Sequence, residues 1–380
     1  MKKYLFVLLL LIAVVVGTTC NTAAPEQTPP DHKIALRWHK AYPTENWKIV
    51  REGLRWSFSF LGANLPAGSF DKAVPVNDSL GFVLDLSQLG FSEPALTALD
   101  SIITKIKTGD EYRKAGSIDL SRLVVLLIGV SENYYAITGV EKTLNAFIKK
   151  HQLEKPLQFG VTQSAVAKHH RLVEFRGDTT DVLNFAFLAV ESEGDLDKGT
   201  FSANVFEAFD IMPNGQLRFS VYDAKGNLIE GSPKQLGEAG KPAKCLWCHE
   251  IHIAGLFVPN TAVNGMLSND EFTSWRNAFQ RNLDKYRTTL NDDLDYSKTQ
   301  DHTFMELLYI SFMEPSLMRL SSEWQLSPTA AQQKMGAAPD HIYEEFPHIG
   351  ELYYRYYVDS VAGVKELKVP VSVREMTKGF

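Results

Sequence analysis

Apolar positions recur every three or four residues over several long stretches of the chain. After Ser92-Glu93-Pro94 this spacing continues as far as Ile106, and Gly109 follows. A serine that can cap the first turn, an early proline and one apolar face are typical of an amphipathic helix, and glycine commonly ends one. The same spacing predicts a second helix over residues 140–151.

The middle of the chain has the shorter period of β-strands. Residues 182–190 are apolar and bounded by polar positions, and residues 217–221 alternate between apolar and polar. A polar turn at 223–227 follows, so we expect a hairpin there. Residues 119–130 are mostly apolar, and period alone does not decide between a buried helix and a buried strand.

Helical spacing returns after a loose stretch at 231–242 that contains several glycines and prolines. Further helices are expected at 270–290, 301–312, 328–335 and 350–361. At about 100–200 residues per domain, the chain is long enough for two domains. We therefore predict an α+β fold class, with a mixed α/β N-terminal domain at 36–235 and a mainly helical domain at 236–380.

The first residues have a different pattern. Met1-Lys2-Lys3 precedes an unbroken apolar run at 4–16, and small residues lead from that run to Cys20. A short positive segment followed by such a run is typical of a secretory signal peptide. A polar, proline-containing stretch at 21–30 follows and has the composition of a tether.

A cysteine just after the apolar run resembles the lipobox of bacterial lipoproteins, in which the thiol takes up a diacylglycerol. The resemblance implies a signal peptide at 1–19, a lipidated Cys20, a tether at 20–35 and attachment to a membrane of the cell envelope. Asn21 stands where such proteins have aspartate for inner-membrane retention, which favours the outer membrane. The alternative is a plain secretory peptide that leaves Cys20 as a free thiol.

Composition and charge indicate whether nucleic acid is a partner of this protein. Of 380 residues, 22% are charged, and the formal net charge is −6. Proteins that bind nucleic acid depend on clustered positive charge to meet the phosphate backbone, and this chain has no basic run. We therefore expect no nucleic-acid partner.

The two cysteines beyond Cys20 lie in the heptapeptide KCLWCHE, residues 244–250. Two intervening residues on a helical turn would hold Cys245 and Cys248 at the spacing of the two vinyl groups of one porphyrin. His249 would then project toward the iron. A disulfide between the cysteines is an alternative, but it usually occurs in a βαβ context, and a loop with Gly240 and Pro242 precedes this motif. A zinc site is a further alternative, but no second pair of ligands follows at the usual distance.

The motif resembles that of the c-type cytochromes over this short stretch. The resemblance implies thioether bonds from Cys245 and Cys248, His249 as the proximal iron ligand, and one covalently bound haem c. It also implies that the helical domain is cytochrome c-like, and that the partner is an unidentified redox protein.

The second axial ligand is expected to be methionine or histidine, as in electron-transfer cytochromes. His252 follows His249 by three residues and would face the same side of a helix, so we reject it. Met313 follows a predicted helix and precedes Pro315, and it is our predicted ligand. The alternatives are Met266, Met305, His341 and His348.

These observations predict an envelope-anchored monohaem c-type cytochrome that transfers electrons. The alternative is that the sixth ligand of the iron is exchangeable. The protein would then be a haem peroxidase, a gas sensor or an accessory haem subunit of an oxidoreductase. A binding or structural lipoprotein whose haem matters little is a third hypothesis. The pattern predicts an electron carrier rather than an enzyme, and no catalytic residue is predicted.

Overall fold

The computed structural model describes residues 32–362 except 78–79, 165–166, 234, 237–239, 250–261, 299–300 and 302. These residues belong to one compact unit, His32–Phe380. The predicted signal peptide at 1–19, Cys20 and most of the tether lie outside the described residues, as does His252.

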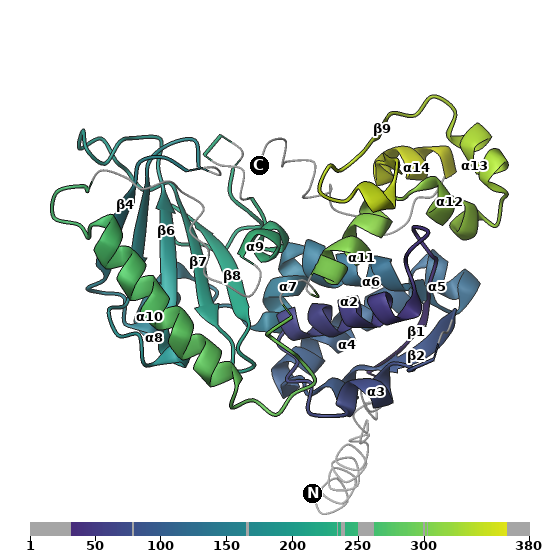
Figure 1. Ribbon diagram of the computed structural model, residues 1–380, viewed down its shortest axis with the longest axis horizontal. Coiled ribbons are helices and arrows are strands. Elements are labelled where there is room, and N and C mark those ends of the chain that lie inside the picture. Colours follow the sequence, from purple (N-terminus) through teal and green to yellow (C-terminus); the bar gives the residue numbers. More distant parts are fainter. Residues whose placement is uncertain are drawn as a thin grey trace, which may run out of the picture. The chain divides into compact units, whose positions relative to one another are not determined.

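A five-stranded antiparallel sheet forms the middle of the chain. Its strands lie side by side in sequence order, from β4 at one edge to β8 at the other (Figure 1). Their bounds are β4 Leu157–Val161, β5 Arg171–Phe175, β6 Ala186–Glu191, β7 Val205–Ile211 and β8 Leu217–Asp223. Because residues paired across antiparallel strands share a face, Phe175, Phe187, Phe209 and Phe219 form one aromatic row on one side of the sheet.

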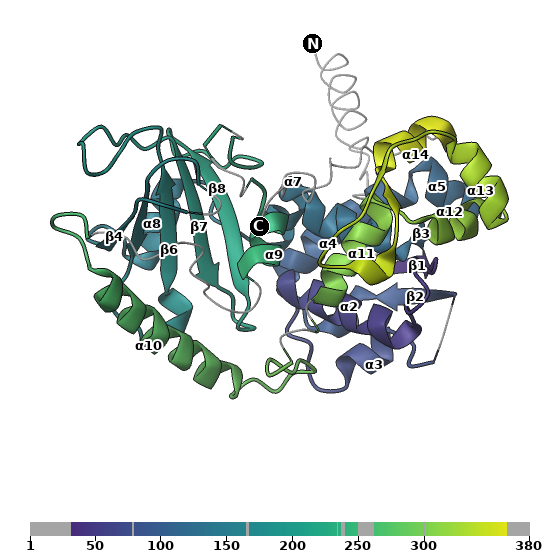
Figure 2. The same cartoon turned by 45° about the horizontal axis from the view of Figure 1, so that its top comes forward.

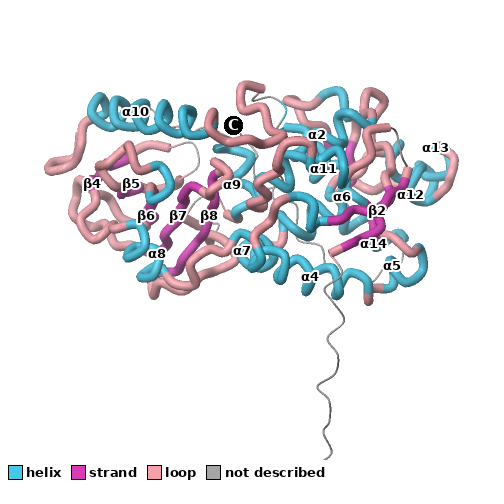
Figure 3. The backbone as a smooth tube through the Cα atoms, turned by 90° about the horizontal axis from the view of Figure 1, so that it is seen from below, coloured by secondary structure: helices cyan, strands magenta, loops and turns pink. Residues whose placement is uncertain are grey.

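Each face of this sheet is covered by a different helix. The aromatic face packs against α10 (Asn269–Arg287), where Phe272 stacks on Phe159 of β4 at 4.3 Å between ring centroids. The opposite face packs against α8 (Leu144–His151), and Phe147 contributes to that smaller core. Figure 3, seen from below, shows α10 and α8 on opposite sides of the strands.

A helical layer lies beside the β8 edge of the sheet. Its members are α2 (Trp47–Phe60), α4 (Glu93–Lys107), α6 (Leu120–Val124), η2 (Val125–Gly129), α7 (Ser131–Thr138) and α11 (Thr303–Met313). Helices α2 and α11 cross closely because α2 has Gly53 at the contact, where a Cβ atom would lie 2.7 Å from the carbonyl oxygen of Phe304. The sheet and this layer share one hydrophobic core.

Smaller elements complete the fold on the far side of the helical layer (Figure 2). They comprise the sheet β2-β1-β3, the hairpin-like pair β9–β10, and short helices. The strand bounds are β1 Lys33–Arg37, β2 Gly81–Asp85, β3 Ile118–Asp119, β9 Asp340–His341 and β10 Leu352–Tyr353. The helix bounds are α3 Ser69–Ala73, η1 Leu86–Leu89, α5 Asp110–Ala115, α12 Leu317–Trp324, α13 Pro328–Met335, η5 Pro347–Ile349 and α14 Arg355–Ala362. Two further short helices, η3 Val182–Asn184 and α9 Pro242–His249, contact the five-stranded sheet instead.

The predicted α+β class is confirmed, since helices and sheets both contribute to the core. The division into domains at 235–236 stays a prediction. Segments from both sides of that point pack together: α11 crosses α2, and α10 covers the sheet.

None of the described helices is by itself both long and apolar enough to cross a membrane. Only a bent pair, Leu120–Gly129 followed by Ser131–Thr138 at 79°, has the required length and composition when its two parts are taken together. Residues 125–129 of this pair are buried in the core of the unit.

Candidate functional site

The cysteine motif lies on α9, the short helix Pro242–His249. Pro242 occupies the first position, where a missing N–H costs no hydrogen bond. The loop before it is closed by a hydrogen bond from the Ser232 N–H to the Gly240 carbonyl, 2.8 Å long. Gly231 is needed here, because a Cβ atom would lie 2.8 Å from that same carbonyl oxygen.

Helix α9 lies between the sheet and the helical layer. It contacts β8 on one side and η2 and α7 on the other, and Figure 1 shows it beside the β8 edge. Leu246 and Trp247 are buried, and the Trp247 ring meets the Tyr309 ring of α11 edge-on at 5.4 Å between centroids. The motif is therefore held by packing on both sides.

Cys245, Cys248 and His249 share one side of α9. Successive helical residues are rotated by about 100°, so residues three and four positions after Cys245 return to its side. Neither cysteine forms a disulfide, and both side chains are half-buried. Burial, the carboxylate of Glu207 and the neighbouring Cys248 raise the pKa of Cys245 well above its usual value.

The His249 imidazole lies against the aromatic row of the sheet. Its ring centroid is 5.7 Å from that of Phe209 and 5.6 Å from that of Phe219. Burial, assisted by the positive charge of Arg171, lowers the pKa of His249 to about 4. The ring is therefore neutral at pH 7, and its buried Nδ1 has no hydrogen-bond partner among the described residues.

Charged residues surround the motif on the same face of the sheet. Arg171 pairs with Glu191, and its Nη2 lies 3.4 Å from Oε2 of Glu207. Lys244, the residue before the first cysteine, is 1% exposed, and its charge lowers the pKa of Glu207. Burial and the charge of Glu191 outweigh that influence, so the pKa of Glu207 is raised overall.

The donor set fits a covalently attached haem. Two thiols that form no disulfide share a helix face with one neutral imidazole, and a buried ring nitrogen without a partner is costly unless a bound group compensates for it. In the part of the chain that the structure describes, no three side chains of His, Cys, Asp or Glu gather as ligands for a metal held by protein groups alone.

Met313, the predicted sixth ligand, is the last residue of α11. Met313 is 3% exposed in the core at the end of α11, one turn after Tyr309 and on the same helix side. Tyr309 contacts Trp247, which is rotated by about 200° from His249 around α9. Met313 as the sixth ligand stays a prediction.

The alternative ligands make contacts of their own. Met305 is fully buried two turns earlier in α11. Met266 lies beside Gly160 of β4, three strands from the Phe209 strand and so about 14 Å away. His341 contacts Glu314 at 2.6 Å, and His348 packs on Tyr42 at 5.4 Å between ring centroids.

The motif alone does not predict the residues that surround it. Phe209, Phe219 and Arg171 come from strands 24 or more residues earlier in the chain, and pairing between strands brings them together. The available signal was composition, because residues 171–175 and 205–211 contain several valine and phenylalanine residues, which are enriched in strands.

No family model, curated protein or solved structure matches this chain. Its function is therefore inferred from its own residues.

Proposed function

We propose that the protein is a monohaem c-type cytochrome that transfers electrons. The observation that carries this proposal is the arrangement on α9, where two cysteines that form no disulfide and a neutral imidazole share one side of a helix packed between sheet and helices. Bound haem would supply an iron that cycles between Fe(III) and Fe(II).

Each residue of the motif has a distinct role in this proposal. Cys245 and Cys248 would bind the porphyrin through thioether bonds, each thiol adding across one vinyl group. His249 would bind the iron through a ring nitrogen, and the low pKa of its imidazole keeps that lone pair free of a proton at pH 7. Phe209 and Phe219 exclude water from the imidazole, which reduces solvent reorganisation around the site.

The test is an absorption spectrum of the protein expressed with c-type haem maturation, taken oxidised and reduced, before and after acid-acetone extraction. Haem that resists extraction supports the proposal. Cys245→Ser with Cys248→Ser should lose all covalent haem, whereas His249→Gln should retain the thioethers and lose the low-spin spectrum. His32→Gln is the matched control, since His32 pairs with Asp100 far from α9 in the sequence. Absence of covalent haem in the wild type would refute the proposal.

The aromatic neighbours of His249 favour a second candidate, an exchangeable sixth site that binds a gas or peroxide. The rings next to the His249 imidazole are those of Phe209 and Phe219, and neither can bind iron. Carbon monoxide added to the reduced protein distinguishes the two candidates. A rapid spectral change favours the sensor or peroxidase, and an unchanged low-spin spectrum favours the electron carrier.

We also propose that Cys20 carries lipid and anchors the protein in the cell envelope, where c-type haem is attached to exported chains. The support is the sequence pattern before Cys20. Cys20→Ala should abolish the lipid mass on the mature N-terminus and move the protein from the membrane to the soluble fraction.

A further inference from the structure

A cavity of about 350 Å³ lies away from α9, where β1, α5 and α6 meet α11 to α14. This volume is at the lower end of those found for small-molecule sites. Segments from both ends of the described chain form its wall, so the cavity exists only in the assembled fold. It shares no residue with the haem motif.

The charged lining of this cavity has an excess of cations. Four carboxylates contribute to it: Glu111, Asp119, Glu323 and Asp359. Five cationic side chains contribute to it: Arg37, Lys114, Arg122, Lys334 and Arg355. This local excess contrasts with the formal net charge of −6 for the whole chain.

The arginines are held in place by carboxylates that they share. Glu111 pairs with both Arg37 and Arg122. Arg355, with a side chain 3% exposed, makes contacts of 2.8 and 3.2 Å with the two carboxylate oxygens of Glu323 and donates from Nε to the Phe312 carbonyl. Held in this way, a guanidinium loses little entropy when an anion approaches.

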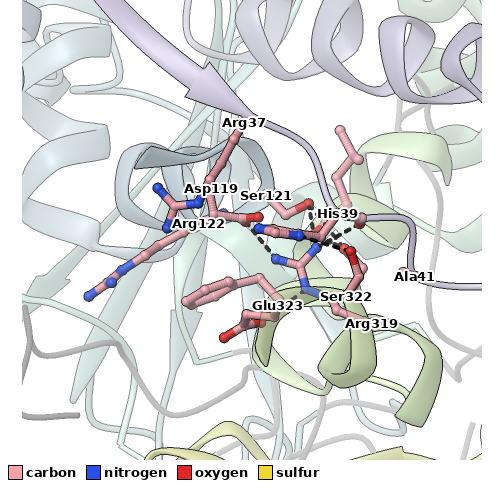
Figure 4. A network of polar contacts seen from close by, with 12 residues as sticks. Arg37, His39, Ala41, Asp119, Ser121, Arg122, Arg319, Ser322 and Glu323 are labelled. Carbon is pink, nitrogen blue, oxygen red and sulfur yellow. Dashed lines mark hydrogen bonds and ion pairs between the residues drawn. The ribbon is translucent and has the colours of Figure 1, made fainter. Parts of the chain in front are cut away.

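A buried network behind the cavity fixes this arrangement. Figure 4 shows Arg319 reaching Asp119 and Ser121, and its Nη2 lies 2.7 Å from Oδ1 of Asp119. Oδ2 of Asp119 is buried and accepts no hydrogen bond from the described residues. Asp119 lines the cavity, so a ligand hydroxyl or amino group could satisfy this oxygen.

Two lysines at the cavity supply positive charge that the described carboxylates do not neutralise. Lys114 and Lys334 are exposed, and neither forms an ion pair with another described residue. The Lys334 ammonium lies over the Trp324 ring, 4.3 Å from its centroid. Trp324, Phe312 and Val358 give the cavity an apolar wall beside the cations.

We propose that this cavity binds a small organic anion whose carboxylate or phosphate group meets Lys114 and Lys334 and whose planar or apolar body packs on Trp324 and Phe312. This site is independent of haem attachment. Carboxylate and phosphate share the chemistry that the lysines recognise, and the test separates them.

The probes are phthalate, an aromatic dicarboxylate, and phenyl phosphate, each titrated calorimetrically into the wild-type protein against potassium chloride at equal ionic strength. We expect one of them to bind with a Kd of about 1 mM or tighter. The tighter of the two identifies the anionic group. Binding of neither probe beyond the chloride control would overturn the proposal.

Lys114→Gln with Lys334→Gln should weaken binding about tenfold or more, because both charges that meet the anion are removed. The matched control is Lys72→Gln with Lys105→Gln, which removes two exposed helical lysines that do not line the cavity. Equal loss of affinity in both double variants, or no loss in the first, would also overturn the proposal. All four lysines are exposed, so these variants should fold.

Discussion

Glu45 is a carboxylic acid with an exposed fraction of only 2%, just before α2. Its Oε2 accepts a hydrogen bond of 2.5 Å from the Ala41 N–H. Burial raises the pKa of Glu45 to about 7, although that hydrogen bond opposes the rise. The folded protein therefore keeps a proton on this group over a range of pH in which the unfolded chain has released it.

The direction of the pH effect follows from this difference. Between pH 4.5 and about 7 the folded state binds more protons at Glu45, so a rise in pH favours the unfolded state. The contribution of Glu45 to the free energy of unfolding is fully present below pH 4.5 and is lost as the pH rises past about 7. The difference between the raised pKa of Glu45 and its ordinary value corresponds to about 3 kcal/mol in the free energy of unfolding.

We predict that Glu45→Gln removes this pH dependence, because the amide stays neutral throughout. Relative to the wild type, its free energy of unfolding should rise by up to about 3 kcal/mol between pH 4 and 8. Urea unfolding at several pH values measures the difference between the two proteins. The control is Glu154→Gln at an exposed position, which should give a constant difference. A constant difference for Glu45→Gln would contradict the prediction.

At the same scale, the cysteine motif could be recognised in the sequence because its three proposed functional residues lie within five positions. Helical periodicity alone puts Cys245, Cys248 and His249 on one side, and the structure has α9 there. The sixth ligand could not be identified from the sequence, because spacing along the chain does not show which side of α9 a distant residue reaches. Met313 illustrates this limit: the helix α11 was predicted, but its spacing does not show which element Met313 faces.

Among the elements, helices with strong end signals were predicted best. The helix α4 begins after Ser92, whose side chain accepts from the Ala95 N–H, and the helix α13 spans Pro328–Met335 as expected. Both have a serine cap followed by an early proline, and these signals act locally.

Elements that depend on distant partners were harder to predict. Residues 119–130 form α6 and η2. The spacing of apolar residues could not predict these helices, because a segment buried on all sides lacks the polar face of an amphipathic helix. The short strands β4 and β5 were missed, since pairing partners determine short strands more than composition does. The predicted strand at 182–190 is confirmed only from Ala186, after a short turn of helix.

The crossing of α2 and α11 leads to a prediction for Gly53. Replacing Gly53 by alanine adds a Cβ atom 2.7 Å from both the Leu308 Cδ1 and the Phe304 carbonyl oxygen. The backbone oxygen cannot move without shifting α11, so overpacking should exceed the gain of about 1 kcal/mol in helix propensity. We expect Gly53→Ala to lower the free energy of unfolding by about 1–2 kcal/mol.

Thermal and urea unfolding measure this loss. Thr104→Ala, at an exposed position of α4, is the control and should change stability by less than about 0.5 kcal/mol. If Gly53→Ala were as stable as the wild type or more so, the two helices would not be in the close contact described.

At the scale of the whole described unit, one ion pair joins distant parts of the sequence. Arg319 of α12 is fully buried and pairs with Asp119, the residue that caps α6, at 2.7 Å. The Arg319 guanidinium also lies near the Phe312 ring of α11, 5.7 Å from its centroid. The C-terminal helices are thus linked to the core by a buried charge as well as by apolar contacts.

Removing one partner of such a pair leaves an uncompensated buried charge, which costs about 3–5 kcal/mol. We therefore predict that Arg319→Met lowers the free energy of unfolding by about this amount and that Asp119→Asn added to it restores part of the loss. Arg281→Met, at an exposed position of α10, is the control and should have little effect.

The helices that lose hydrogen-exchange protection in Arg319→Met show whether the described unit unfolds cooperatively. Because the pair lies between α12 and α6, Arg319→Met should reduce hydrogen-exchange protection in α13, α11 and α2 together. Loss confined to α12, α13 and α14 would mean that the C-terminal helices unfold independently of the core. In that case the cavity lined by Arg122 and Arg355 would open without global unfolding, and anion binding there should protect those three helices alone.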